Sequence, residues 1–208
     1  MEEQEKSVLN QSQESLTEEQ KKKLQELIEE EEGVTRKVGG FWNAIISILA
    51  VAMSLFAIYS AIQPVTTQIL RGVHVAFLLA ISFLYYPIAK KYKGKINVFD
   101  IFLCLLGMAC IIYMLVDFED FIYRAVTPEL WDMIFGVLFI LLVLETTRRT
   151  SGLIMPVTCI IFLIYAYVGP WLPAPWTHRG YDLERIVGHM YMTLEGIFGV
   201  PIDVSSSI

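Results

Sequence analysis

The sequence predicts an all-α integral membrane protein with about five transmembrane helices, a C-terminal amphipathic surface helix and a polar N-terminal leader. Of its 208 residues, 55% are hydrophobic and only 18% are charged, whereas an average soluble protein is about 25% charged. A water-soluble fold could not bury this much apolar surface. A nucleic-acid-binding domain needs a basic face, but the formal net charge here is −6. The composition therefore excludes a soluble enzyme and a nucleic-acid-binding protein.

The first 37 residues form an acidic leader. They contain 11 of the 22 carboxylates and 6 of the 16 lysines and arginines, and they do not show the basic start and apolar core of a secretory signal peptide. We interpret residues 1–37 as a cytoplasmic leader that is partly disordered. Residues 17–32 could form a helix, and its few apolar positions favour a solvated helix over one that binds a partner.

Four stretches of the chain are long and apolar enough to be membrane spans. A helix needs about 20 predominantly apolar residues to cross roughly 30 Å of hydrocarbon, and charged side chains at its centre are costly. The four stretches are residues 41–62, 72–89, 96–116 and 151–169.

One more span, the fourth of five in chain order, is predicted over residues 128–147. Thr127-Pro128-Glu129 is typical of a helix start, and a helix of 20 residues from Pro128 is about 30 Å long. Asp132 and Glu145 would then lie near its two ends rather than at its centre.

Small residues recur along 41–62 at steps of three and four, which predicts close packing of that helix within a bundle. They are Ser47, Ala50, Ser54, Ala57 and Ala61.

The distribution of lysine and arginine predicts the orientation. Arg36 and Lys37 precede the first span, four lysines lie between residues 90 and 95, and Arg148 and Arg149 follow the fourth span. The other two connections contain one arginine each. Because positive charge collects in cytoplasmic loops, we predict a multi-pass protein of the cell (inner) membrane with a cytoplasmic N-terminus and with residue 170 onward outside.

This topology predicts the result of cysteine-accessibility labelling. In intact cells a membrane-impermeant reagent is expected to modify a cysteine at position 174 and to leave one at position 93 unmodified. Position 93 is expected to react only once the cytoplasmic side is opened. Labelling of both positions from the same side would contradict the topology.

Asp100 is the one carboxylate inside a strongly predicted span, and intramembrane acids are functional candidates by default. It lies five residues after Lys95, so Lys95 or Lys93 could reach it by snorkelling. We predict a structural ion pair near the interface, with a proton or ion site as the alternative. Glu145 and Arg149 are spaced i, i+4, which predicts a second pair at a helix end.

No catalytic or metal-binding pattern occurs in the sequence. The three cysteines lie in apolar stretches without CxxC or Cys/His spacing, and the three histidines lack carboxylate or cysteine neighbours at ligand spacing. We therefore expect no enzymatic activity, no cofactor and no metal.

The region after the fifth span combines a Pro/Trp-rich loop with an amphipathic pattern. Three prolines in six residues exclude regular helix over 170–175, and apolar residues then recur at helical spacing from Asp182 to Phe198. We predict an amphipathic helix lying on the membrane or against a partner. Possible partner-contact residues are Trp171, Trp176, Arg179 and Arg185. The alternative is that the tryptophans only anchor the span in the headgroups.

Three stretches carry a resemblance to a known family. Residues 144–152 read LETTRRTSG and are followed by Pro156, residues 178–189 read HRGYDLERIVGH, and residues 191–201 read YMTLEGIFGVP. Together they resemble the small-subunit region of the fused permeases of TRAP-type transporters, in the TAXI branch. The likeness covers about residues 38–208 and is most specific over 178–208.

The resemblance implies a function and a division of the chain. TRAP transporters are secondary importers served by an extracytoplasmic solute-binding protein, and their large membrane region holds the substrate and coupling-ion sites. By likeness, 38–150 is a four-helix membrane scaffold, 151–176 a connector helix and outer loop, and 177–208 an amphipathic helix and the start of the large transport region. The chain stops where that region should begin.

The resemblance thus implies the scaffold portion of an ion-driven importer for small, organic-acid solutes. Its partners would be the lipid bilayer, the large transport region on the same or a second polypeptide, and the solute-binding protein. On that reading Asp100→Asn leaves the ion dependence and rate of the intact transporter unchanged. The alternative is a self-contained structural or assembly membrane protein without transport activity.

Overall fold

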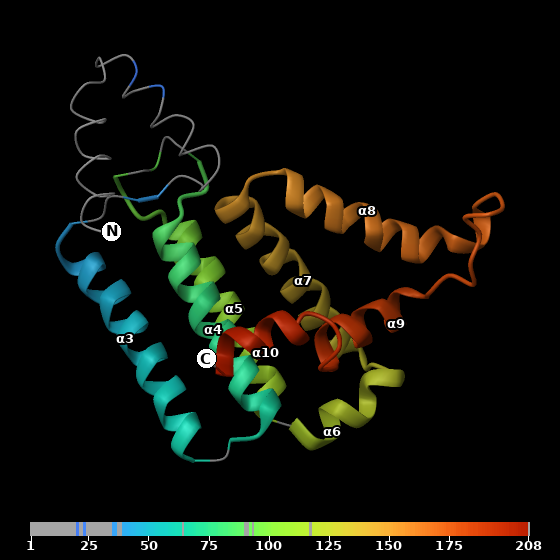
Figure 1. Ribbon diagram of the computed structural model, residues 1–208, viewed down its shortest axis with the longest axis horizontal. Coiled ribbons are helices and arrows are strands. Elements are labelled where there is room, and N and C mark those ends of the chain that lie inside the picture. Colours follow the sequence, from blue (N-terminus) through green and yellow to red (C-terminus); the bar gives the residue numbers. More distant parts are fainter. Residues whose placement is uncertain are drawn as a thin grey trace, which may run out of the picture.

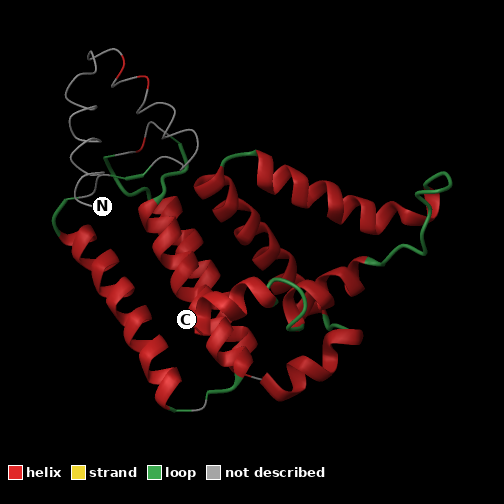
Figure 2. Ribbon diagram, in the orientation of Figure 1, coloured by secondary structure: helices red, strands yellow, loops and turns green. Residues whose placement is uncertain are grey.

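The computed structural model describes residues 20, 23, 35–36, 39–63, 65–89, 92, 94–116 and 118–207, and within this part it is entirely α-helical, with no strand (Figures 1 and 2). The fold class predicted from the sequence is confirmed. The predicted helix at 17–32 and nearly all of the leader at 1–37 lie outside the described residues.

Five helices are long and apolar enough to cross a membrane, which confirms the number of spans. They are α3 (Phe41–Ile62), α4 (Thr67–Tyr85), α5 (Val98–Val116), α7 (Leu130–Ser151) and α8 (Ile154–Val168), the last extended by a 3₁₀ turn at Gly169–Trp171. The short elements are α6 (Phe118–Tyr123), a 3₁₀ turn (Arg124–Val126), α9 (Leu183–Val187), a π-helical turn (Gly188–Met192) and α10 (Val200–Ser207).

The second span begins five residues earlier than predicted. Helix α4 starts at Thr67 and includes Arg71, because Asp203 and the backbone carbonyl of Phe198 accept hydrogen bonds from the arginine side chain. It ends at Tyr85, and Tyr86 is extended, as expected for a residue that precedes a proline.

Helix α7 begins with a capping box. The side chain of Glu129 caps the first turn, and the side chain of Asp132 accepts a hydrogen bond from the backbone N–H of Glu129 at 2.9 Å. The helix ends before Gly152, whose φ of 75° lies in the region that favours glycine. Only Gly152 and Leu153 separate α7 from α8.

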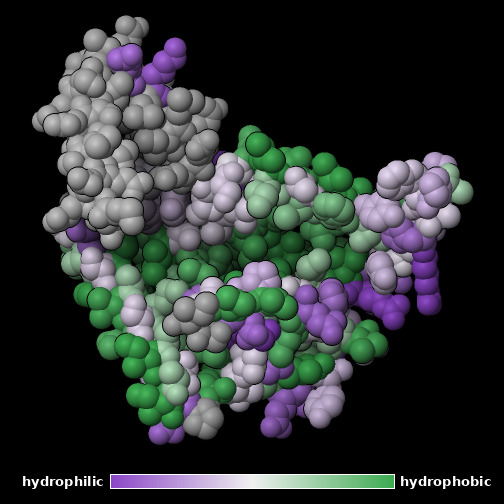
Figure 3. All heavy atoms as spheres, in the orientation of Figure 1, coloured by the Kyte–Doolittle hydropathy of each residue, from purple (hydrophilic) through white to green (hydrophobic). Residues whose placement is uncertain are grey.

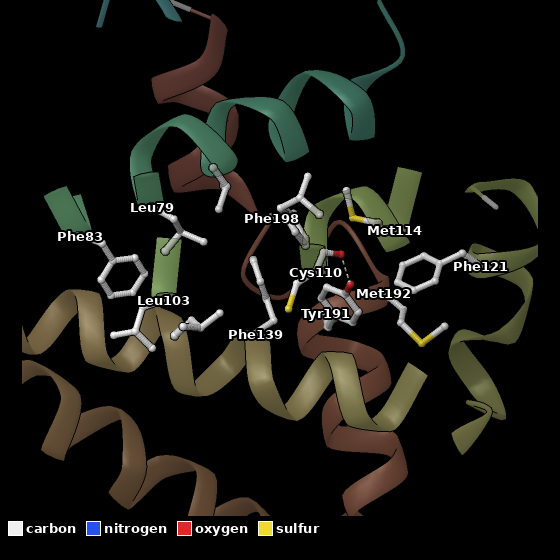
Figure 4. Close-up of a cluster of buried hydrophobic side chains, with 13 residues drawn as sticks. Leu79, Phe83, Leu103, Cys110, Met114, Phe121, Phe139, Tyr191, Met192 and Phe198 are labelled. Atoms are coloured by element: carbon white, nitrogen blue, oxygen red, sulfur yellow. Dashed lines mark hydrogen bonds between the residues drawn. The ribbon is translucent and has the colours of Figure 1, made fainter. Parts of the chain in front are cut away.

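Helices α4, α5 and α7 form the centre of the molecule, and the chain from α9 to Phe198 packs into them. The buried apolar cluster contains residues from all of these elements (Figure 4), among them Leu79, Phe83, Leu103, Met114, Phe121, Phe139, Tyr191, Met192 and Phe198.

Helices α3 and α8 lie at opposite flanks of this centre (Figure 1). All of α3 is described and none of its residues is buried, while α8 buries only Pro156. The prediction of close packing along the small-residue stripe of α3 is therefore wrong within this chain: the stripe is exposed except at Ala57, which is half-buried. Figure 3 shows a largely hydrophobic surface over both flanks.

The predicted amphipathic helix over 182–198 is broken. It runs as α9 and the π-helical turn to Met192, and turns connect it to α10. The N–H of Ile197 donates to the carbonyl of Met190 at 3.0 Å, which folds the chain back on itself. A Cβ on Gly196 would lie 2.4 Å from the carbonyl oxygen of His189, so this return requires glycine.

The apolar stripe of this segment is in part buried within the bundle, although Leu183 at its start is 54% exposed. Val187, Tyr191, Met192 and Phe198 are each 3% exposed or less. The bundle buries these side chains because α5 and α7 offer matching apolar faces, with Gly136 of α7 lying directly beneath Val187.

Gly188→Ala is expected to destabilise the protein by about 1–3 kcal/mol or more, the usual range for overpacking. A Cβ at this position would lie 2.3 Å from the carbonyl oxygen of Ala125, and a backbone atom cannot rotate away. The matched control is Gly94→Ala, where a Cβ meets nothing within 4 Å. Denaturant titration of the purified proteins in mixed micelles measures the difference. Equal stability of the two variants would contradict this packing.

Candidate functional site

The Pro/Trp loop is an ordered hairpin that folds back on the end of α8. The backbone N–H of His178 donates to the carbonyl of Gly169 at 3.2 Å, and the N–H of Tyr181 donates to the carbonyl of Ala166 at 3.0 Å. Gly180 has a φ of 73° and its N–H donates to Nδ1 of His178 at 3.1 Å. The rigidity expected from the prolines is thus reinforced by backbone hydrogen bonds.

Three of the four predicted contact residues lie on this hairpin and the fourth lies just beyond it. Trp171 and Trp176 are 72% and 65% exposed, and Arg179 is exposed as well. Arg185 lies on α9 and lines a groove beside α8. Trp171, Trp176 and Arg179 thus lie on the hairpin at one end of the molecule, where polar residues gather (Figure 3). Arg185 belongs instead to the groove.

That groove is lined by residues of α7, α8, α9 and the segment that follows α9. It has a volume of about 560 Å³. Figure 1 shows that two of the helices that line it, α7 and α8, diverge from one another. Its walls are almost wholly apolar side chains. The polar side chains among its lining residues are those of Tyr181, Arg185 and His189, with the Cys159 thiol on α8.

A second, smaller recess of about 280 Å³ adjoins the groove. It shares Ile140, Leu163 and Ile186 with the groove and continues along α8 to Tyr167. The two recesses therefore form one apolar surface between α7, α8 and α9. Neither is lined by a carboxylate of the described residues, so an organic acid or a coupling cation has no polar cage there.

Asp100, in the first turn of α5, lies beside the last turn of α7 and is fully buried. Its Oδ2 accepts a hydrogen bond from Nη2 of Arg36 at 2.6 Å, and its Oδ1 accepts one from Nη1 of Arg149 at 2.7 Å. The predicted ion pair therefore exists, but its partners in the described residues are two arginines and not Lys95. Lys95 is exposed, and Lys93 lies outside the described residues.

The reason for this different partnership is the position of Asp100 in the first turn of α5. The N–H of Asn97 donates to its Oδ2 at 3.4 Å, which fixes the carboxylate at the buried side of the helix start. Arg36, from the chain before α3, and Arg149, from the last turn of α7, both reach that side. Arg36, at the end of the leader, is thus buried in the bundle instead of staying in solvent.

Arg36 and Arg149, together with Arg148, also bind the end of α4. The Arg36 side chain donates to the carbonyl of Leu84 at 3.0 Å, the Arg149 side chain to that of Tyr86 at 3.1 Å, and the Arg148 side chain to that of Ile88 at 3.2 Å. The Leu84 carbonyl is in the last turn of α4 and the other two follow that turn, a region where helical partners are missing and cations are favoured.

Glu145 completes this cluster. It accepts hydrogen bonds from both Arg148 and Arg149 at 2.8 Å, which confirms the predicted i, i+4 pair with Arg149. Both oxygens of each acid are thus occupied by arginine. The cluster joins the leader, α4, α5 and α7, and its geometry is that of a structural lock.

A second buried acid, Asp132, lies at the other end of α7. Besides capping the helix, it accepts hydrogen bonds from the Tyr113 hydroxyl at 2.7 Å and from Nε of Arg124 at 3.1 Å. The sequence placed Asp132 near a helix end, but it did not reveal these partners. The only sequence signal near these partners was the pattern of a helix start at residues 127–129.

A third polar contact ties α10 to α4. Arg71 forms an ion pair with Asp203 at 2.5 Å, and the Ser205 hydroxyl lies 3.1 Å from Nε2 of His74. In the described part of the chain no three His, Cys, Asp or Glu side chains are grouped so as to hold a metal ion. These polar groups thus serve packing between helices.

No protein-family model, curated protein or solved structure matches this chain.

Proposed function

We propose that this chain is the membrane scaffold portion of a TRAP-type, binding-protein-dependent importer for small organic-acid solutes. The observation that carries the proposal is that the buried carboxylates are hydrogen-bonded to donors within the chain itself. Asp100 and Asp132 are fully buried, and each has both oxygens bound to side-chain or backbone donors of this chain. Such groups hold helices together, and both buried carboxylates of the described residues are already bound within the chain.

The residues that carry the family resemblance support the same proposal, because many of them hold the fold. Glu145, Arg148 and Arg149 build the charge cluster, Gly180 shapes the hairpin, and Gly188 allows the close approach to Ala125. A shared set of fold-determining residues is what a shared scaffold requires.

The uncovered flanks suit such a role. Helices α3 and α8 expose apolar side chains along their whole lengths, which fits contact with lipid and with the large transport region. The exposed tryptophans and Arg179 of the hairpin would face the solute-binding protein or the large region, since Trp and Arg dominate many interfaces.

Reconstitution tests the proposal. Proteoliposomes would contain this chain alone, a TAXI-type large membrane region alone, or both together, each with the solute-binding protein. Uptake of radiolabelled succinate, malate and 2-oxoglutarate would be measured with and without sodium and proton gradients. We expect uptake only when both membrane components, the binding protein and a gradient are present.

Three results would contradict the proposal. Uptake by this chain alone would make it a transporter, and full uptake by the large region alone would make the scaffold dispensable. If the two components do not form a complex that survives size-exclusion chromatography, the chain is instead a self-contained structural or assembly protein.

Reversing the charge of Arg179 tests the role of the hairpin. Arg179→Glu in the complete transporter is expected to weaken uptake severalfold and to change its salt dependence, because Arg179 is exposed beside the two tryptophans. The control is Lys95→Glu, an exposed cation at the other end of the bundle. Equal uptake by both variants would leave membrane anchoring as the role of this loop.

A further inference from the structure

The groove between α7, α8 and α9 has the size of a small-molecule site. Its volume of about 560 Å³ lies within the roughly 300–1,000 Å³ typical of such sites. With the adjoining recess it follows α8 from Cys159 to Tyr167, a distance of about 12 Å at 1.5 Å per residue. It is therefore long and narrow.

The walls of the groove select an apolar occupant. Ile140, Val143 and Leu144 of α7 face Phe162 and Leu163 of α8 across it. Both helices are among the candidate membrane spans, so the groove opens where a bilayer supplies acyl chains. Water would find almost no hydrogen-bond partners on these walls.

One rim of the groove is cationic. Arg185 and His189 are four residues apart on α9 and the turn that follows it, and both line the groove. Arg185 is exposed, and its side chain forms no ion pair with any carboxylate of the described residues. The neighbouring Glu184 does not share its face of the helix. A guanidinium in this position can bind a phosphodiester through two parallel hydrogen bonds.

We propose that this groove binds one glycerophospholipid, with its acyl chains between α7 and α8 and its phosphodiester on Arg185. The charge at the rim and the apolar walls match the two parts of that molecule, and the Tyr181 hydroxyl and His189 supply further polar contacts at the same rim. The bound lipid would hold the diverging α8 against the bundle. This inference stands without the transport function proposed above.

Native mass spectrometry of the purified full chain tests the proposal. After delipidation the protein would be titrated with phosphatidylglycerol, with phosphatidylethanolamine, and with a diacylglycerol of the same chains that lacks phosphate. We expect one molecule of either phospholipid to bind. The diacylglycerol is expected to bind at least about tenfold more weakly, because a hydrogen-bonded charge contributes that much.

Two variants and their matched controls locate the lipid. Arg185→Gln is expected to reduce phospholipid affinity about tenfold, whereas Arg179→Gln, which removes a charge outside the groove, leaves it unchanged. Ala166→Phe fills the groove and is expected to abolish binding, whereas Ile161→Phe, on α8 outside the groove lining, has no effect. Circular dichroism checks that each variant is folded. If Ala166→Phe does not fold, Arg185→Gln still tests the proposal, because it changes only an exposed side chain.

Cys159 provides a readout inside the groove. It is an exposed thiol on the groove wall, so bound phospholipid is expected to slow its alkylation by N-ethylmaleimide in the wild type and not in Arg185→Gln. Equal lipid affinity of Arg185→Gln and Arg179→Gln, equal binding of the phosphate-free lipid, or unprotected Cys159 would each overturn the proposal. So would a photo-crosslinker at position 162 that captures a protein instead of a lipid in native membranes.

Discussion

Replacing Asp100 with alanine is expected to destabilise the bundle by about 3–5 kcal/mol, the usual cost of breaking a buried ion pair by removing one partner. Asp100 is fully buried between Arg36 and Arg149, whose side chains are also fully buried. Arg149 keeps Glu145 as a partner, but within the described residues the Arg36 side chain is left with the Leu84 carbonyl as its acceptor. Nε of Arg36 and Nη2 of Arg149 already lack hydrogen-bond partners, so nothing nearby compensates the loss.

The measurement is unfolding in mixed micelles, followed by circular dichroism. Asp120→Ala removes an exposed carboxylate on α6 and is the matched control, with an expected change within about 0.5 kcal/mol. The double variant Asp100→Ala with Arg36→Met removes the charge left unpaired and should recover part of the loss. If Asp100→Ala is as mild as Asp120→Ala, the buried cluster described above does not exist.

The conservative variant Asp100→Asn separates structure from ion coupling. In the transporter proposed above, it is expected to lower the amount of folded protein while leaving the ion stoichiometry of the remaining molecules unchanged. Both oxygens of Asp100 accept hydrogen bonds from buried arginines, so the charge of the carboxylate is already compensated within this chain. A changed ion stoichiometry would make Asp100 a coupling residue.

Tyr191→Ala is expected to cost about 3–5 kcal/mol, the range for deleting a fully buried aromatic ring. The ring is 0% exposed and packs between Phe121 and Phe139, with ring centroids 5.3 and 5.1 Å away (Figure 4). Packing of this kind is a main source of helix association in a bilayer. Its hydroxyl donates to the carbonyl of Cys110, and burial raises the pKa of that hydroxyl, so it stays protonated.

Two controls define what Tyr191→Ala measures in the same unfolding experiment. Tyr123→Ala removes a tyrosine that is 84% exposed and is expected to change little. Tyr191→Phe keeps the ring and loses one hydrogen bond, with an expected cost of about 1 kcal/mol. If Tyr191→Ala matched Tyr123→Ala, the segment after α9 would lie on the surface of the bundle, as its sequence pattern alone suggested.

The five spans could be predicted because their signal is local. Hydropathy over about 20 residues decides whether a helix can remain in a bilayer, and helix ends follow from residues at those ends. The span predicted over 128–147 is observed as α7 (Leu130–Ser151), whose start lies within two residues of the predicted one. The start of α4 could not be predicted, because the charge of Arg71 is neutralised by Asp203, 132 residues later in the chain.

The candidate sites were only partly predictable. The sequence identified Asp100 as an ion-paired carboxylate at a helix end, but it favoured lysines a few positions away. Its partners, Arg36 and Arg149, are 64 and 49 residues distant, and a single sequence contains no signal that pairs them. The groove beside α8 could not be predicted either, because it depends on the angle at which two consecutive helices diverge.

By itself the sequence determined that this is an all-helical protein with five spans, an ordered Pro/Trp loop and an apolar stripe from Leu183 to Phe198. Only the tertiary structure decided what covers that stripe. Burial in lipid and burial against protein place the same demand on residue type, since both exclude water from apolar side chains. The choice between them depends on shape, and here Gly136 of α7 and Gly188 after α9 allow the segment to approach closely enough to become part of the core.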